Sequence, residues 1–373
     1  MTDWIHLISE WSASMNRVFD QAKRQVKTVL GIEDPLQILP YRGYGTRDRL
    51  YFMGRVLRDE GIRPGSQDTP IWENALNMFR RFESDEVPGA RLRLTFENQQ
   101  QELVTDQEGY FRAEVFPSEL SGDRLRYQAQ VELLDPHPRK KEQVRAMAEA
   151  IVPLTTAQFG VISDIDDTIV HSRATDLLEM LWIAYLGNAH TRLPFPGVAK
   201  FYKALQAGKS GNDGNPVFYV SSSALNMYDV FEEFMDLHDL PAGTLFLREM
   251  ELSLENWLSF SHEGHKRGKI EAILECYSEL PFILIGDSGQ EDAEIYRQLV
   301  HDYPHRVKCI YIRNVSQEKP RRQKELEAIA QDVQSLGSPF VIVPDTFTAA
   351  QHAANQGWIA PDTLFEIQQS DRW

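Results

Sequence analysis

Acidic side chains gather just after two apolar segments of the chain. The segments are FGVIS and FILIG, and the acids that follow them are Asp164, Asp166, Asp167, Asp287 and Asp292. Like charges held close together are costly unless a cation or a shared proton compensates them. Ligand sets made only of oxygen atoms suit a hard divalent cation, most simply Mg²⁺. We therefore expect a magnesium-binding cluster here, and not merely acids that solubilise the ends of strands.

Three other kinds of acid or metal site do not fit the sequence. A calcium-binding EF-hand loop starting at Asp164 would need glycine where Ile169 stands and a bidentate acid where Thr175 stands. A paired-aspartate protease needs Asp-Thr-Gly turns, and Asp167-Thr168 is followed by isoleucine instead. The histidines show no paired helical spacing with a glutamate, which argues against a zinc hydrolase.

Hydroxyl and ammonium groups occur between the two acidic segments. The apolar run VFYVSSS ends in serines, of which Ser221 is the first candidate to hydrogen-bond a phosphoryl oxygen and Ser222 the second. The segment HKRGK places Lys266 and Lys269 at the start of an expected helix, where an ammonium can neutralise a phosphate. Taken singly, such serines more often cap turns and such lysines are usually solvated. Their order relative to the acids indicates a phosphate site.

The elements that must carry these residues alternate between strands and helices. Apolar runs predict strands over 159–163, 217–221, 244–248, 282–286, 307–313 and 340–343. Helical spacing covers 177–187, 226–237, 268–277, 291–300 and 318–335. This alternation predicts an α/β domain over residues 151–350, with a parallel sheet covered by helices on both faces. Ligands bind at the carboxyl ends of such strands, where the acids and serines lie.

The residues before this domain have a different texture. Short β-rich segments are separated by turn residues over 51–59, 91–97, 101–105, 110–115 and 125–134. This spacing predicts a small β-sandwich-like domain over residues 35–150, which ends in a charged connector over 135–150. Beyond the α/β domain, residues 351–373 are expected to form a C-terminal tail.

Residues 3–30 carry apolar side chains at helical spacing, which predicts an amphipathic helix that ends at Gly31. Packing of this helix on the body of the protein is one interpretation. The other is peripheral membrane contact, in which basic side chains approach lipid phosphates, namely those of Arg17, Lys23, Arg24 and Lys27. The N-terminus lacks the basic region and cleavage site of a secretory signal. No apolar run is long enough for a transmembrane helix.

Composition limits the classes of partner. The chain has 373 residues, 55 acidic against 39 basic, and a formal charge of −16, which disfavours generic binding of nucleic acid. The apolar fraction of 42% is ample for packed domains, and the length suggests two of them. Two cysteines, Cys276 and Cys309, cannot build a disulfide framework or a zinc cluster. We expect them to be reduced thiols in a cytoplasmic protein.

The order DxDxT, strand-end Ser, Lys, and Gly-Asp followed by an acid resembles the haloacid-dehalogenase superfamily of phosphotransferases over residues 159–292. Within it, the chain resembles the actin-patch phosphatidate phosphatase family, which is lipin-like, over most of residues 153–345. The segments that carry this resemblance are SDIDDTIVHS, GNAHTRLPFPGVAKFYKAL, FYVSSSALNMYD, PAGTLFLRE, HKRGKIEAIL and ILIGDSGQEDAEIY. RRFESDEVPGARL and TDQEGYF look like the β region that precedes this domain in bacterial relatives.

The resemblance implies a Rossmann-like fold with a small cap and a Mg²⁺-dependent phosphatase that uses an aspartyl phosphate. It implies Asp164 as the nucleophile and Asp166 as the general acid and base, with a pKa raised by its acidic neighbours. Mg²⁺ is then held by Asp164, Asp287 and the main-chain carbonyl of Asp166. Asp292 is either a ligand through water or a support.

The resemblance also suggests the residues that position the phosphoryl oxygens, Ser221 and a lysine. A lysine directly after a histidine selects Lys266, whereas a lipin-type lysine before isoleucine selects Lys269. The implied reaction is hydrolysis of phosphatidate to diacylglycerol. The cap over 177–187 places Trp182 at helical spacing with other apolar residues, either to meet lipid or simply to pack.

Two other functions stay open at this point. The same site would also serve a phosphatase of phosphoproteins or soluble phosphoesters. The second alternative is a scaffold, in which residues 35–150 bind a partner and the α/β domain is inert. The sequence disfavours inertness because every catalytic position is filled.

Overall fold

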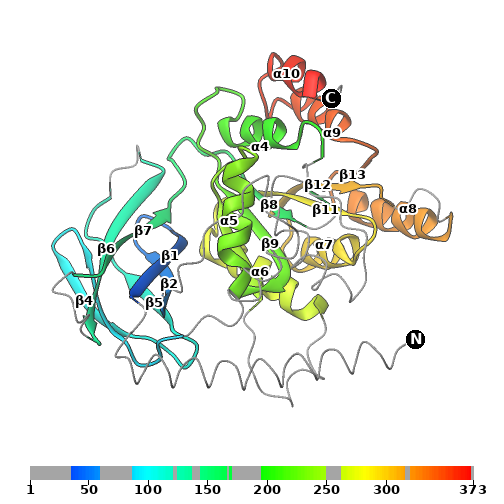
Figure 1. Ribbon diagram of the computed structural model, residues 1–373. Helices are drawn as coiled ribbons and strands as arrows, with labels where there is room; N and C mark the ends of the chain where they lie inside the picture. The colour runs from blue at the N-terminus through cyan, green and yellow to red at the C-terminus, as the bar shows by residue number, and fades with distance from the viewer. Residues whose placement is uncertain are drawn as a thin grey trace, which may run out of the picture.

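Two sheets organise the protein in the computed structural model, an N-terminal one and a C-terminal one that lie side by side (Figure 1). The structure describes residues 35–58, 86–120, 124–136, 143–165, 168–169, 195–248, 262–315 and 320–370. The helices expected over 3–30 and 177–187, including Trp182, lie outside these residues, and so does Asp166.

Seven strands form the N-terminal sheet, in the order β4-β3-β6-β7-β1-β2-β5. They are β1 (Leu36–Gly45), β2 (Leu50–Arg58), β3 (Arg91–Phe96), β4 (Gln99–Val104), β5 (Tyr110–Val115), β6 (Arg126–Asp135) and β7 (Arg145–Ile151). Neighbouring strands are antiparallel except β1 and β7. The expected strands over 51–59, 91–97, 101–105, 110–115 and 125–134 are confirmed as β2 to β6.

This sheet curls around its own core. The edge strands β4 and β5 contact each other, and the side-chain amide of Gln99 donates to the carbonyl of Phe116 at 2.9 Å. Inward-facing apolar residues of most of its strands, such as Phe52, Leu94 and Val131, form one buried cluster. The unit is therefore one folded-over sheet, whereas a sandwich of two separate sheets was expected.

The charged connector expected over residues 135–150 is wrong for its last residues. Residues 145–150 belong to β7, which lies between β6 and β1 inside the sheet. Its inward positions, Ala148 and Ala150, are fully buried. Alanine is a poor β-former, so the strand alternation is weak in the sequence. Strand β1 was missed for a related reason, because its glycines are also poor β-formers and are typical of turns. A Cβ on Gly43 would lie 2.0 Å from the Tyr51 carbonyl oxygen, so the irregular β1–β2 pairing there needs glycine.

Six parallel strands form the C-terminal sheet, in the order β10-β9-β8-β11-β12-β13, as expected. They are β8 (Gly160–Asp164), β9 (Val217–Ala224), β10 (Thr244–Arg248), β11 (Phe282–Asp287), β12 (Val307–Arg313) and β13 (Phe340–Val343). The helices are α4 (Val198–Ala207), η1 (Leu225–Met227), α5 (Tyr228–Leu237), α6 (His262–Cys276), α7 (Asp292–Asp302), α8 (Pro320–Ser335), α9 (Thr346–Asn355) and α10 (Thr363–Ser370).

Helices cover both faces of this sheet. Successive residues of a strand point to opposite faces, so neighbouring residues of β8 pack against different helices. Val161 packs with α4, α5, α9 and α10 on one face, while Ile162 packs with α6, α7 and α8 on the other. Residues 363–370, expected in a tail, form α10 instead, and its Ile367 is buried in the first of these cores. Eight residues with few apolar positions give too weak a helical pattern for detection from sequence.

Strand β1 joins the two units. The ring of Tyr41 stacks on that of Tyr228 with centroids 3.9 Å apart, and the Arg42 amide donates to the Tyr228 hydroxyl at 2.6 Å. The Gly45 amide donates to the Tyr277 hydroxyl at 3.2 Å. These contacts hold the N-terminal sheet against α5 and against Tyr277, which follows α6, and β1 also contacts β10. Among the described residues, no helix combines the length and hydropathy that crossing a membrane requires.

Candidate active site

Three neighbouring strands bring the polar residues of the sequence motifs to one edge. Strands β9, β8 and β11 are adjacent and parallel; Asp164 and Asp287 are the last residues of β8 and β11, and Ser221 lies in the second half of β9, which continues to Ala224. Asp164 is paired with Val220 in the β8–β9 register, so Ser221 lies one position beyond it. All three side chains are buried. The topology therefore brings these three residues to the same edge of the sheet, as expected from the sequence.

Three carboxylates converge at this edge. Asp164, Asp287 and Asp292 each offer an oxygen, and these oxygens lie within 4.8 Å of one another. Asp292 is the first residue of α7, the helix that follows β11 after a short loop, and its Oδ2 accepts from the backbone amide of Asp287 at 3.0 Å. A Cβ on Gly286 would lie 2.4 Å from that same oxygen. The glycine of the Gly-Asp motif thus makes room for the carboxylate of Asp292.

The loop after β11 fixes the orientation of Asp287. Its Oδ1 accepts from the backbone amides of Gly289 at 2.6 Å and Gln290 at 3.1 Å. Arg322 of α8 holds the same loop from outside by donating to the carbonyls of Ser288 at 2.9 Å and Gln290 at 2.8 Å. A carboxylate held in this way has little freedom to move, which suits a ligand or charge-stabilising group.

Lys266 of α6 supplies the cation of the cluster. Its side chain is buried, its Nζ lies 2.8 Å from Asp164 Oδ1, and it also bonds Asp292 Oδ1. Burial acts to lower the pKa of this ammonium, but the nearby carboxylates of Asp164 and Asp292 outweigh burial and hold the pKa well above its usual range. Lys266 therefore stays charged throughout the neutral range.

Lys269 lies elsewhere. It stands one helical turn after Lys266 and lines a cavity between the two units, together with Tyr44 and Thr244. Of the two lysines considered from sequence, the structure brings only Lys266 into contact with the carboxylates. Ser221 Oγ accepts from the Ser223 amide at 3.0 Å and so also stabilises its own turn, while Ser222 is half-buried beside it.

The backbone of Asp164 is held from the α4 face of the sheet. Ser163 Oγ donates to the Asp164 carbonyl at 2.6 Å and lies 2.7 Å from the Tyr202 hydroxyl. Burial raises the pKa of Tyr202, which keeps its hydroxyl protonated. The Phe195 amide donates to the Ile169 carbonyl at 2.8 Å, which ties residue 195 to the end of the DxDxT segment.

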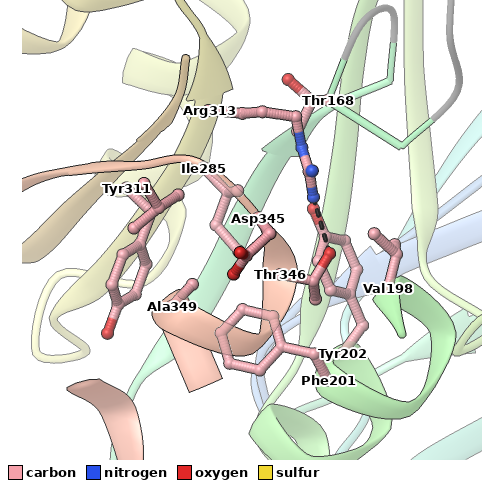
Figure 2. A pocket seen from close by; sticks show the side chains of 11 residues that line it. Thr168, Val198, Phe201, Tyr202, Ile285, Tyr311, Arg313, Asp345, Thr346 and Ala349 are labelled. Carbon is pink, nitrogen blue, oxygen red and sulfur yellow. Dashed lines mark hydrogen bonds between the residues drawn. The ribbon is translucent and has the colours of Figure 1, made fainter. Parts of the chain in front are cut away.

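Arg313 lies beside the candidate site and was not identified from the sequence. It ends β12, where it pairs with Asp287 in register, and only 9% of it is exposed. Its guanidinium lies 3.9 Å from the Phe195 ring centroid. It also donates to Thr346 Oγ1 at 2.7 Å, a hydrogen bond drawn as a dashed line in Figure 2. The signal in the sequence is a single arginine at the end of the apolar run VKCIYIR. The neighbours that explain its burial lie on distant segments.

The residues present fit a divalent metal ion. Counted over the residues that the structure describes, with all groups ionised, three buried carboxylates face one ammonium, and their formal charges sum to −2. Uncompensated buried charge of this size is costly, and a divalent cation supplies the opposite charge. The donors are all carboxylate oxygens, which suit Mg²⁺ or another hard cation. Asp292 has both oxygens engaged by protein groups, so it acts as a bridge between Lys266 and the Asp287 backbone.

Comparison with known proteins points to the same region. Residues 159–314 match the family of the catalytic domain of phosphatidate phosphatase APP1. Phosphatidate phosphatase APP1 of Saccharomyces cerevisiae is 30% identical over 156 residues, which cover 42% of this chain and 26% of the yeast protein. An uncharacterised protein of Schizosaccharomyces pombe is 24% identical over 251 residues, which cover 65% of this chain and 40% of that protein.

The chain thus spans 26% and 40% of the lengths of these two relatives. Among solved structures, a Bifidobacterium dentium β-glucuronidase aligns with 83% of this chain and 53% of its own, with a TM-score of 0.27 and 10% identity. A likeness at that level carries no conclusion about fold or function. The matched family segment, in contrast, contains Asp164, Ser221, Lys266, Asp287 and Asp292.

Proposed function

We propose that this chain, whose residues 159–314 match the family of the phosphatidate phosphatase APP1 catalytic domain, is a magnesium-dependent phosphatase of a lipid phosphomonoester, most directly phosphatidate. The observation that carries the proposal is the buried cluster of Asp164, Asp287 and Asp292 with Lys266 at the carboxyl edge of a parallel sheet. This is the edge at which open α/β sheets bind ligands.

In this proposal, Mg²⁺ is held by Asp164 and Asp287, together with the main-chain carbonyl of Asp166. Asp292 supports the site, because its two oxygens already bond Lys266 and the Asp287 amide. The cation, when bound, neutralises negative charge on the phosphoryl group. The protein's own contribution is to hold the carboxylates in place, through the amides of Gly289 and Gln290 and through Gly286.

Asp164 is the proposed nucleophile. Its contact with the Lys266 ammonium favours the ionised carboxylate, which is the form that attacks phosphorus. An Asp164 oxygen forms a bond to phosphorus while the bond between phosphorus and the lipid alkoxide breaks. Asp166 gives its proton to the alkoxide. Asp166 then takes a proton from water, whose oxygen attacks the aspartyl phosphate and releases inorganic phosphate with Asp164 regenerated.

Lys266 and Ser221 are the proposed positioning groups for the phosphoryl oxygens. Lys266 carries a fixed positive charge in a buried setting, where an electrostatic contact is stronger than in water. Ser221 stands on β9, the strand next to the one that carries Asp164, and its turn is closed by the Ser223 amide. Positioning and charge neutralisation are the main tasks of a protein in phosphoryl transfer.

The test is phosphate release by the full chain from three substrates, each with Mg²⁺ and with EDTA. The substrates are phosphatidate in vesicles, a soluble chromogenic phosphoester and a phosphopeptide. We expect Mg²⁺-dependent release that is fastest from phosphatidate. Faster release from either water-soluble substrate would instead support the second phosphatase reading. Absence of release from all three, by a folded protein, would support the scaffold.

A further inference from the structure

Arg322 of α8 contacts the loop that follows β11 from outside the candidate active site. Its side chain is only 17% exposed. Its Nε donates to the carbonyl of Ser288 at 2.9 Å, and a terminal nitrogen donates to the carbonyl of Gln290 at 2.8 Å. The same guanidinium is bidentate to the carboxylate of Glu294 in the first turn of α7, with one contact at 3.0 Å. A single planar group therefore ties this loop to the start of α7.

One peptide group links Arg322 to the orientation of Asp287. The carbonyl of Ser288 and the amide of Gly289 belong to the same peptide group, and that amide donates to Asp287 Oδ1 at 2.6 Å. Because a peptide group is planar, fixing its oxygen also fixes the direction of its N–H. A hydrogen bond accepted by the oxygen also polarises the group and strengthens its N–H as a donor. Arg322 thus acts on the carboxylate of Asp287 through the backbone of the loop.

The pairing with Glu294 keeps the guanidinium in place. Burial acts to raise the pKa of Glu294, but the hydrogen bonds and the charge of Arg322 outweigh burial and hold this pKa below its usual value. The pair therefore stays ionised at neutral pH. A guanidinium presents five donors in one plane, so it can hold the carboxylate and both loop carbonyls together. A lysine ammonium is a point charge on a flexible stem and lacks this fixed arrangement of donors.

The stiffness of the loop bears on which ion the site prefers. Mg²⁺ requires short bonds in nearly octahedral geometry, whereas Ca²⁺ accepts longer bonds and a more variable ligand shell. A carboxylate that is held in one orientation therefore favours Mg²⁺, and a carboxylate that can move favours Ca²⁺. We propose that Arg322 is a positioning residue that makes the site selective for Mg²⁺ over Ca²⁺ by fixing Asp287. This inference rests on the proposed function, in which Asp287 is a ligand of the metal ion.

The test is calorimetric titration of the full chain with Mg²⁺ and, separately, with Ca²⁺, without substrate. The quantity compared is the dissociation constant for Ca²⁺ divided by that for Mg²⁺. We expect Arg322→Lys to bind Mg²⁺ about tenfold more weakly than the parent, as for loss of a partner that orients a metal ligand. Binding of Ca²⁺ should weaken much less, so the ratio should fall. Both ions carry the same charge, so a general electrostatic effect of a substitution cancels in this ratio.

Three further variants separate positioning from charge and from folding. Arg322→Gln, which removes the charge, should lower the ratio as Arg322→Lys does. Glu294→Gln keeps Arg322 but weakens its pairing, so it should lower the ratio by a smaller factor, and it decides the question if the Arg322 variants do not fold. The matched control is Arg321→Lys, at a side chain that is 94% exposed and pairs with Glu325, and it should leave both dissociation constants unchanged.

Circular dichroism and thermal unfolding in metal-free buffer verify that each variant is folded. The proposal is overturned if the folded Arg322 and Glu294 variants keep the ratio of the parent, or if their binding of both ions weakens equally. In that case the proposed function stands, because the parent still binds Mg²⁺ in the same series of titrations. A parent chain that binds no Mg²⁺ would instead contradict the metal site itself, and the proposed function with it.

Discussion

The carboxyl edge of the six-stranded sheet and the interface between the two units are both buried and polar, but their charges are balanced differently. At the edge, three carboxylates share one ammonium. At the interface, the polar contacts include neutral hydrogen bonds to the hydroxyls of Tyr228 and Tyr277, and the Arg42 ion pairs reach partly exposed acids. The charge of Arg42 at the interface is thus paired with acids of the protein, whereas among the described residues of the edge three carboxylates face one ammonium, an imbalance that a bound cation would relieve.

This difference predicts that substitutions at the edge affect mainly turnover, and that substitutions at the interface affect mainly stability. The largest effect is expected for Asp164→Asn. The amide keeps the shape of the side chain but cannot attack phosphorus, so phosphate release should fall by about a thousandfold or more. The matched control is Asp239→Asn, at a largely exposed acid that pairs with Lys203. A folded Asp164→Asn protein that kept a tenth of the rate would remove Asp164 as the nucleophile.

Lys266→Met should be next in size, because it leaves three buried carboxylates without their ammonium. Turnover should fall by about a hundredfold, as for loss of one positioned charge-stabilising donor. The free energy of unfolding should fall by about 3–5 kcal/mol without Mg²⁺, and less with it. Lys269→Met should have a much smaller effect on turnover of a soluble ester, and Lys324→Met serves as the surface control. Equal loss in the two α6 variants would contradict the assignment of Lys266.

Tyr228→Phe tests the interface, where we expect a loss of stability without a loss of turnover. The phenyl ring can keep its stacking on Tyr41, but the amide of Arg42 loses its acceptor. An unsatisfied buried amide costs about 1–3 kcal/mol, and this one is partly buried, so thermal and urea unfolding should show a loss near the lower end of that range. Phosphate release at 25 °C should keep the parent KM and kcat. A drop in kcat without a loss of stability would mean that the interface takes part in the chemistry.

The smallest effect is expected from pH. His352 of α9 has Nδ1 2.8 Å from the Tyr311 hydroxyl, and burial lowers the pKa of His352 below its usual 6.5. The unfolded chain therefore binds this proton more readily. The stability that comes from the neutral imidazole is fully present above about pH 6.5 and is lost as the pH falls toward the lower folded pKa. Urea unfolding of His352→Gln at pH 7.5 and 5.5 should show a slightly smaller acid loss than the parent, and an equal loss would refute this contribution.

The sequence predicted those parts of the fold and of the candidate site that depend on residues close together in the chain. Continuous apolar runs located all six parallel strands, and the topology then brought Asp164, Ser221 and Asp287 to one edge. Strand β7 was lost because alanines occupy its inward positions, and β1 because glycines and Pro40 disguise it. Arg313 could not be assigned, because its partners Phe195 and Thr346 come from segments far away in sequence.

The choice between Lys266 and Lys269 shows the same limit. Both lysines stand in one short segment, and family resemblance gave a reason for each. One helical turn separates them, yet they reach different environments, because Lys266 contacts Asp164 while Lys269 lines the cavity between the units. Only the packing of α6 against its neighbours distinguishes them, and that packing is a property of the whole fold.

The most direct test of the central proposal is to capture the phosphate on the protein. The full chain is mixed with phosphatidate labelled at phosphorus in the presence of Mg²⁺ and quenched with acid within the first turnover. We expect protein-bound label that hydroxylamine releases, as an acyl phosphate requires, and no label in Asp164→Asn or in excess EDTA. Label that persists in Asp164→Asn, or full phosphate release in EDTA, would contradict a magnesium-dependent aspartyl phosphate at Asp164.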